Sequence, residues 1–123
     1  MFITTTNDVA GYIIDAVLGE VMGLSVRSPN ASAAFGAGFR ALSGGEVPEM
    51  TQMVYEGRQQ VMQRMADQAK SRGANAVIAM RFDASPMGEA WTELCAYGTA
   101  VIVTPIPAGE PGSTPQSAAA PLT

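Results

Sequence analysis

Hydrophobic residues recur at intervals of three and four along the middle of the chain, and this interval is typical of one face of an α-helix. The opposite positions are polar or charged. Pro48 suits the first helical turn, where its missing N–H costs nothing, and Gly73 suits the left-handed residue just beyond a helix C-terminus. The pattern therefore predicts a long amphipathic helix that ends before Gly73. Its apolar positions are Val47, Met50, Val54, Gly57, Val61, Met65 and Ala69.

Four other stretches have the composition of β-strands. Residues 76–80 follow the helix directly as a short apolar run, which is typical of a strand buried on both faces. Residues 2–6 are β-branched and predict a short edge strand. Residues 12–26 and 91–103 predict two longer strands, and apolar residues occupy both sets of alternate positions.

Glycines and turn-forming residues mark the connections. Gly19 and Gly23 suggest bulges or bends within the strand at 12–26. Residues 84–90 contain a Ser-Pro pair and a glycine, and they predict a hairpin loop. Residues 31–42, rich in glycine and alanine, predict a short second helix.

The predicted order is strand, strand, helix, helix, strand, strand. This order favours an α+β fold in which one long and one short helix cover one face of a small antiparallel or mixed sheet. Because the strands are apolar on both faces, the second sheet face needs another cover. We therefore expect a homo-oligomer.

The composition changes at the end of this domain, which we place at residues 1–104. Residues 105–123 form a low-complexity tail rich in proline, alanine, serine and glycine, and we expect the tail to be disordered or extended. Such a tail suits a tether or a site for a protein partner.

Composition and charge exclude several classes of function. With 123 residues, close to half of them hydrophobic, the chain is long enough for one folded domain. A net charge of −4 and seven scattered lysines and arginines argue against nucleic-acid binding. No stretch approaches the roughly 20 apolar residues of a membrane span, and the N-terminus lacks the pattern of a signal peptide. A single cysteine gives no sign of an oxidising compartment, so the cytoplasm is expected.

Short segments with a specific pattern occur between residues 2 and 103. They are Ile3–Thr6, Gly19–Gly23, Ala37–Arg40 with Gly44–Gly45, Gly73–Ile78, Arg81–Asp83, and Glu93 with Ala96–Val101. In their order and spacing these segments together resemble the YbjQ-like family, which carries the label "putative heavy-metal-binding". The resemblance implies a small α+β subunit in a ring-shaped homo-oligomer, a pentamer or a multiple of five. It implies a divalent or soft metal ion as a ligand, and no known reaction.

The residues themselves give mixed support for a metal. The chain has no histidine, and one cysteine cannot build a cysteine-rich zinc site within a subunit. Cys95 lies within an apolar run and is better interpreted as a small buried hydrophobe, although a ring could bring several copies together. Two Met-x-x-Met pairs on the helix have thioethers that suit Cu(I), but core packing is the better interpretation. The pairs are Met50 with Met53 and Met62 with Met65.

Carboxylates are the other candidates. Asp15, Glu20, Asp83 and Glu93 fall in or beside strands, where an unpartnered carboxylate is costly to bury. They could form a cation site or an acid–base site at a subunit boundary, or interface ion pairs with an arginine. The candidate metal ligands are Glu20, Asp83, Glu93 and Cys95, and the candidate ion-pair partners are Arg40 and Arg81.

Catalytic motifs are not apparent. Without histidine, neither a Ser–His nor a Cys–His pair can form. Gly36 and Gly38 lack the rest of a dinucleotide-binding pattern. A non-enzymatic, self-assembling binding or scaffold protein is therefore the favoured hypothesis. A heavy-metal-binding protein is the first alternative, and an enzyme with carboxylates at a subunit boundary is the second.

Overall fold

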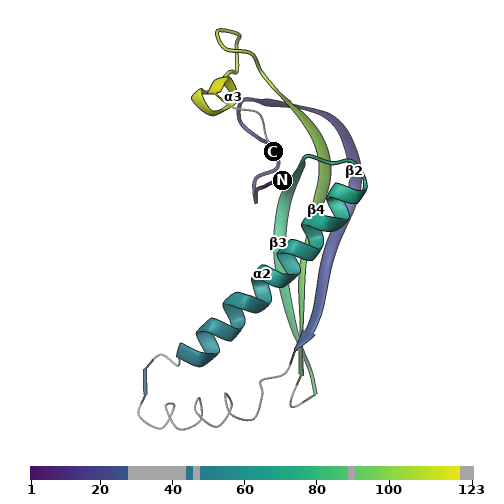
Figure 1. The fold of residues 1–123 in the computed structure, drawn as a ribbon, viewed down its shortest axis with the longest axis vertical. Coiled ribbons are helices and arrows are strands. Elements are labelled where there is room, and N and C mark those ends of the chain that lie inside the picture. Colours follow the sequence, from purple (N-terminus) through teal and green to yellow (C-terminus); the bar gives the residue numbers. More distant parts are fainter. Residues whose placement is uncertain (28–43, 46–47, 89–90, 120–123) are drawn as a thin grey trace.

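A computed structural model describes residues 1–27, 44–45, 48–88 and 91–119, and shows a four-stranded sheet with a long helix along one face (Figure 1). The strands lie in the order β1-β3-β4-β2, with β1 parallel to β3 and the other neighbours antiparallel. The predicted α+β class and mixed sheet are confirmed. The helix predicted at 31–42 lies outside the described residues. The strands are β1 (Phe2–Ile3), β2 (Tyr12–Arg27), β3 (Ala76–Met87) and β4 (Trp91–Pro105).

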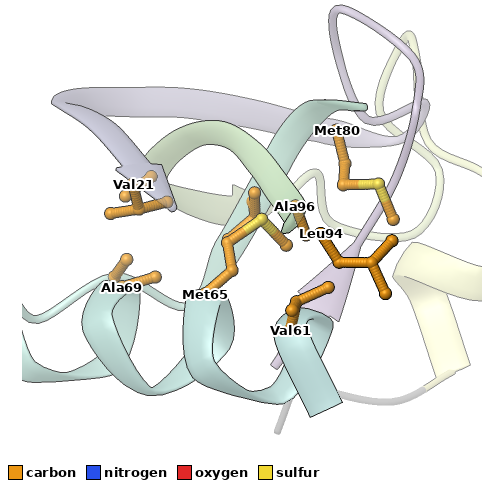
Figure 2. Packing of buried hydrophobic residues seen from close by; sticks show 10 residues of the cluster. Val21, Val61, Met65, Ala69, Met80, Leu94 and Ala96 are labelled. Atoms are coloured by element: carbon orange, nitrogen blue, oxygen red, sulfur yellow. The ribbon is translucent and has the colours of Figure 1, made fainter. Parts of the chain in front are cut away.

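The long helix α2 spans Pro48–Ser71 and matches the predicted helix. Gly73 has a φ of 87°, as expected for the left-handed residue beyond the helix. Figure 2 shows Val61, Met65 and Ala69 pointing from α2 toward the sheet. These three side chains are fully buried, and with residues of β2, β3 and β4 they form the larger of two hydrophobic clusters. We call the sheet face under α2 the inner face.

Gly23 lets α2 approach the sheet. A Cβ atom at this position would lie 2.0 Å from the carbonyl oxygen of Val61 and 2.7 Å from the amide nitrogen of Met65. A bulge is not present at Gly23, because the pairing of β2 with β4 continues through it without a register shift. The prediction for Gly19 is confirmed, since the register shifts there and its φ is 100°.

Side chains of α2 also cover the outer edge of β2. This strand ends the sheet, so alternate backbone groups along it have no neighbouring strand. The amide of Met22 donates to Gln68 Oε1 at 2.8 Å. Arg72 Nη1 donates to the carbonyl of Glu20 at 2.7 Å, and Arg64 Nη1 donates to that of Leu24 at 2.5 Å. We call Arg64 and Gln68 of α2, together with Arg72 just beyond its end, the edge clamp.

The smaller hydrophobic cluster lies on the opposite face of the sheet, which we call the outer face. Ala76 and Ile78 belong to this cluster, whereas Val77 between them belongs to the cluster under α2. Alternate residues of a strand point to opposite faces, so the two clusters are on different sides of the sheet. Val9 and Tyr12 also belong to this cluster, and they cover the outer face around Ala76 and Ile78.

The hairpin between β3 and β4 is tighter than predicted. The prediction of a loop at residues 84–90 is wrong for residues 84–87, which continue β3 and pair with residues 91–94 of β4. The edge strand predicted at 2–6 is likewise only two residues long as β1. Backbone hydrogen bonds from Thr4 to Val77 and from Ala79 to Thr6 still hold this segment against β3.

The tail folds back onto the domain. The short helix α3 (Pro115–Ala119) lies near the start of β2 (Figure 1). Ser117 is buried, and its hydroxyl donates to the carbonyls of Thr114 at 3.1 Å and Ile106 at 3.4 Å. A Cβ atom at Gly11 would lie 2.4 Å from Thr114 Oγ1. The prediction of a disordered or extended tail is therefore wrong for residues 105–119.

Candidate functional site

The uncovered half of the outer face is the main candidate surface. It consists of the hairpin ends of β3 and β4 and the second half of β2, beyond the reach of the smaller cluster. Large hydrophobic side chains are exposed across all three strands, and Leu24, Trp91 and Val26 are 46%, 53% and 55% exposed. We call this set the apolar stripe. Its members are Met22, Leu24, Val26, Met87, Trp91 and Tyr97.

The sheet register places the predicted metal ligands on this same face. Asp83 of β3 and Leu24 of β2 lie directly opposite Cys95 of β4, on either side of it. Glu93 is two residues along β4 from Cys95, and therefore points to the same side. Glu20 is opposite Thr99, further along the same face. The four predicted ligands thus lie on one face of the sheet, although at least one row of paired residues separates some of them.

The thiol of Cys95 is half-buried among negative charges. Burial raises the pKa of this thiol above its ordinary value of 9.0, and the carboxylates of Glu93, Asp83 and Glu20 raise it further. A thiol in this environment stays protonated at neutral pH. It is therefore a poor nucleophile and, in the isolated subunit, a poor metal ligand, because both roles require the thiolate.

A complete metal site is not present within the described ranges, where no group of three His, Cys, Asp or Glu side chains could hold an ion. Met65 is fully buried and Met62 packs beside it, which confirms the core interpretation for that pair. Met50 and Met53 are not in the core cluster but line a pocket between α2 and the sheet, near the β3–β4 hairpin.

The arginine predicted for interface ion pairs binds backbone groups within its own chain. Arg81 Nη1 donates to the carbonyl of Thr5 at 3.0 Å and to its neighbour Met80 at 2.8 Å. Arg40 lies outside the described residues. Asp15, on the covered end of β2, accepts a hydrogen bond from the hydroxyl of Thr104. Within one subunit, Arg81 and Asp15 thus have structural partners that the sequence does not reveal.

The edge clamp and Arg27 are polar groups that the sequence analysis did not select as candidate site residues. The sequence does indicate the edge clamp, because long polar side chains recur at intervals of four in α2 and just beyond its end. It also indicates that Arg27 points inward, since Arg27 continues the inward-facing series of Val21, Gly23 and Ser25 on β2. A charge at the end of a strand is common, however, so this signal is weak.

No helix in the part of the chain that the structure describes is long and apolar enough to cross a membrane. The fold and the exposed face define a small α+β domain whose sheet is covered by its own helix on one side and only partly covered on the other.

The chain belongs to the YbjQ-like family, since residues 1–104 match the family model described as "Putative heavy-metal-binding". It is 53% identical over 104 residues to a UPF0145 protein of Acidothermus cellulolyticus, covering 85% of this chain and 96% of that one. It is 44% identical to a UPF0145 protein of the archaeon Sulfurisphaera tokodaii, over 85% of this chain and 91% of that one.

A similar fold occurs in a crystal structure of a Pediococcus pentosaceus protein of unknown function from the DUF74 family. The TM-score is 0.59 at 18% sequence identity, and the match covers 84% of this chain and 97% of the other. This likeness supports the fold alone. The tail beyond residue 104 lies outside the family match.

Proposed function

We propose that this protein is a non-enzymatic binding or scaffold protein that assembles into a homo-oligomeric ring through the apolar stripe. The observation that carries the proposal is the exposure of large hydrophobic side chains on three adjacent strands of one sheet face. Contiguous exposed apolar surface of this kind usually marks a protein interface. The cytoplasm remains the expected compartment, because one cysteine gives no sign of an oxidising environment.

A second copy is the best cover for this face for two reasons. The β2 edge of the sheet offers little, because the edge clamp occupies it. The face also carries both signs of charge, with Arg81 next to Asp83 and Glu93 nearby. In an assembly, Arg81 of one copy can face a carboxylate of the next, which offsets part of the repulsion among the carboxylates of this face.

The test is native mass spectrometry of the wild type and of a variant with Leu24→Asp and Val26→Asp. The proposal expects a ring-sized mass, at five copies or a multiple of five, that the variant reduces to monomer. Gln59→Asp is the matched control, because it adds a negative charge to an exposed position on α2. A wild-type monomer, or an unchanged oligomer in the double variant with folding intact by circular dichroism, would reject the stripe as the interface.

Metal binding between subunits is the second candidate function, and the position of Cys95 beside Asp83 and Glu93 favours it. One subunit does not complete a site, but a ring that brings these faces together would supply donors from neighbouring copies. A bound cation would lower the pKa of the thiol and so reverse the effect of the carboxylates.

Elemental analysis of the oligomer, purified without chelator, tests this function. Stoichiometric metal that is lost in Cys95→Ser, while the oligomer persists, would support it. A metal-free oligomer that gains no thermal stability from added Zn²⁺ or Cu⁺ would exclude it.

A further inference from the structure

A pocket of about 350 Å³ lies between the first half of α2 and the inner face of the sheet, near the hairpin end. This volume is at the lower end of the range of small-molecule sites, roughly 300–1,000 Å³. Among the described residues most of the lining is apolar, and it comes from both α2 and the sheet. The lining residues are Met50, Met53, Val54 and Arg58 from α2, and Arg27, Ala84, Thr92 and Leu94 from the sheet.

Two arginines give this pocket a positive charge, in a chain whose net charge is −4. The described residues that line the pocket include no acidic side chain. Arg27 reaches along the sheet under α2, where its Nη1 would lie 3.0 Å from a Cβ atom at Gly57. Arg58 places its guanidinium 4.8 Å from the ring centre of Phe82, a cation–π contact that leaves its N–H groups available.

The guanidinium of Arg27 has an unsatisfied donor. Its Nη1 is buried and has no hydrogen-bond acceptor among the residues that the structure describes. A buried charged donor without an acceptor is costly, and an anionic oxygen is the partner that would relieve this cost most effectively. The pocket therefore combines an apolar wall with an arginine whose buried Nη1 lacks an acceptor.

We propose that this pocket binds an anionic amphiphile of the fatty-carboxylate class. The carboxylate would accept hydrogen bonds from Arg27 and Arg58, and the alkyl chain would lie against Met50, Met53 and Leu94. Methionine side chains are flexible and polarizable, so they adapt to alkyl chains of different length and shape. This site is separate from the apolar stripe, because it lies on the other face of the sheet, and it does not depend on self-assembly.

The experiment is isothermal titration calorimetry of the full chain with octanoate, and with octylammonium as a ligand of equal length and opposite charge. The proposal expects saturable octanoate binding and at least tenfold weaker octylammonium binding. Arg58→Gln should weaken octanoate binding about tenfold, which is the effect of losing one charge-assisted hydrogen bond. Arg58 is exposed on α2, so this variant should fold. Lys70→Gln, which removes an exposed charge near the other end of α2, should bind octanoate as the wild type does.

A second variant tests the location. Ala84→Phe introduces a ring from the sheet side of the pocket, and it should abolish octanoate binding while the circular dichroism spectrum and thermal unfolding stay unchanged. Equal affinity for octanoate and octylammonium would overturn the proposal. So would octanoate binding that Arg58→Gln and Lys70→Gln alter equally, or binding that survives Ala84→Phe.

Discussion

Gly23 provides the most direct test of how the helix and the sheet pack together. In Gly23→Ala, the added methyl group would lie 2.0 Å from the carbonyl oxygen of Val61, about 1.4 Å closer than the 3.4 Å at which ordinary contact begins. The obstacle is helix backbone, so no side-chain rotation can remove the clash. Either α2 must move away from β2 or β2 must bend.

The cost should be large for a change of one methyl group. Overpacking typically costs about 1–3 kcal/mol, and a rigid backbone obstacle places Gly23→Ala at the upper end of that range or above it. Moving α2 outward would also loosen Val61 and Met65, which are fully buried, and would stretch the edge clamp. We expect a loss of about 3 kcal/mol in the free energy of unfolding, which corresponds to a fall in Tm of at least about 12 °C.

Urea unfolding followed by circular dichroism, at one fixed protein concentration, measures this loss. Gly57→Ala is the matched control on the helix side. Its Cβ atom would meet Leu94 Cδ1 at 2.8 Å and Arg27 Nη1 at 3.0 Å, and both are ends of flexible side chains. Alanine also favours the helix by about 1 kcal/mol over glycine, so the net change should be within about 1 kcal/mol of zero. If Gly23→Ala loses less than 1 kcal/mol, the close packing inferred at this position is wrong.

The edge clamp and the thiol give two more predictions. Arg64→Ala with Gln68→Ala should cost about 2 kcal/mol, one hydrogen bond each, and should increase light scattering on heating because the edge of β2 becomes available for pairing. Unchanged scattering would mean that the clamp does not protect the edge. The raised pKa of Cys95 means that the folded state holds the thiol proton more tightly than the unfolded state. Its contribution to stability is complete below the ordinary pKa of 9.0 and is lost as the pH rises through the folded value. The unfolding free energy of the wild type should therefore fall more steeply above pH 9 than that of Cys95→Ala, and parallel pH curves would contradict this.

The parts of the fold that depend on local patterns are predictable from the sequence. The helix at Pro48–Ser71 has a regular spacing over many turns, and Gly73 marks its end. The hairpin loop predicted at 84–90 is wrong for residues 84–87, because proline is a typical turn residue and Pro86 lies in β3 instead. It can occupy β3 because the strand has β4 on one side and no described neighbour on the other at this point, so the missing N–H costs no hydrogen bond.

The parts that depend on register and on distant contacts are not predictable in this way. Alternation places Glu93 and Cys95 on one face of a strand, but only the pairing of two strands brings Asp83 opposite Cys95. The register shift between Ile78 and Arg81 sets that pairing, and no residue pattern in the sequence predicts the shift. The expectation of a disordered or extended tail fails for a similar reason. Its composition is typical of disorder, whereas its structure depends on contacts of Ser117 with residues earlier in the chain.

The edge clamp also has a consequence for the order in which the chain folds. α2, β3 and β4 are consecutive and can form together through contacts that are near in sequence. β2 must wait, because its neighbour β4 follows it by more than 60 residues and its clamp residues by about 40 to 50. During synthesis this apolar strand is therefore made well before the elements that protect it. The interval between these two events is when the chain is most exposed to misassociation, and a chaperone would have most effect on its yield there.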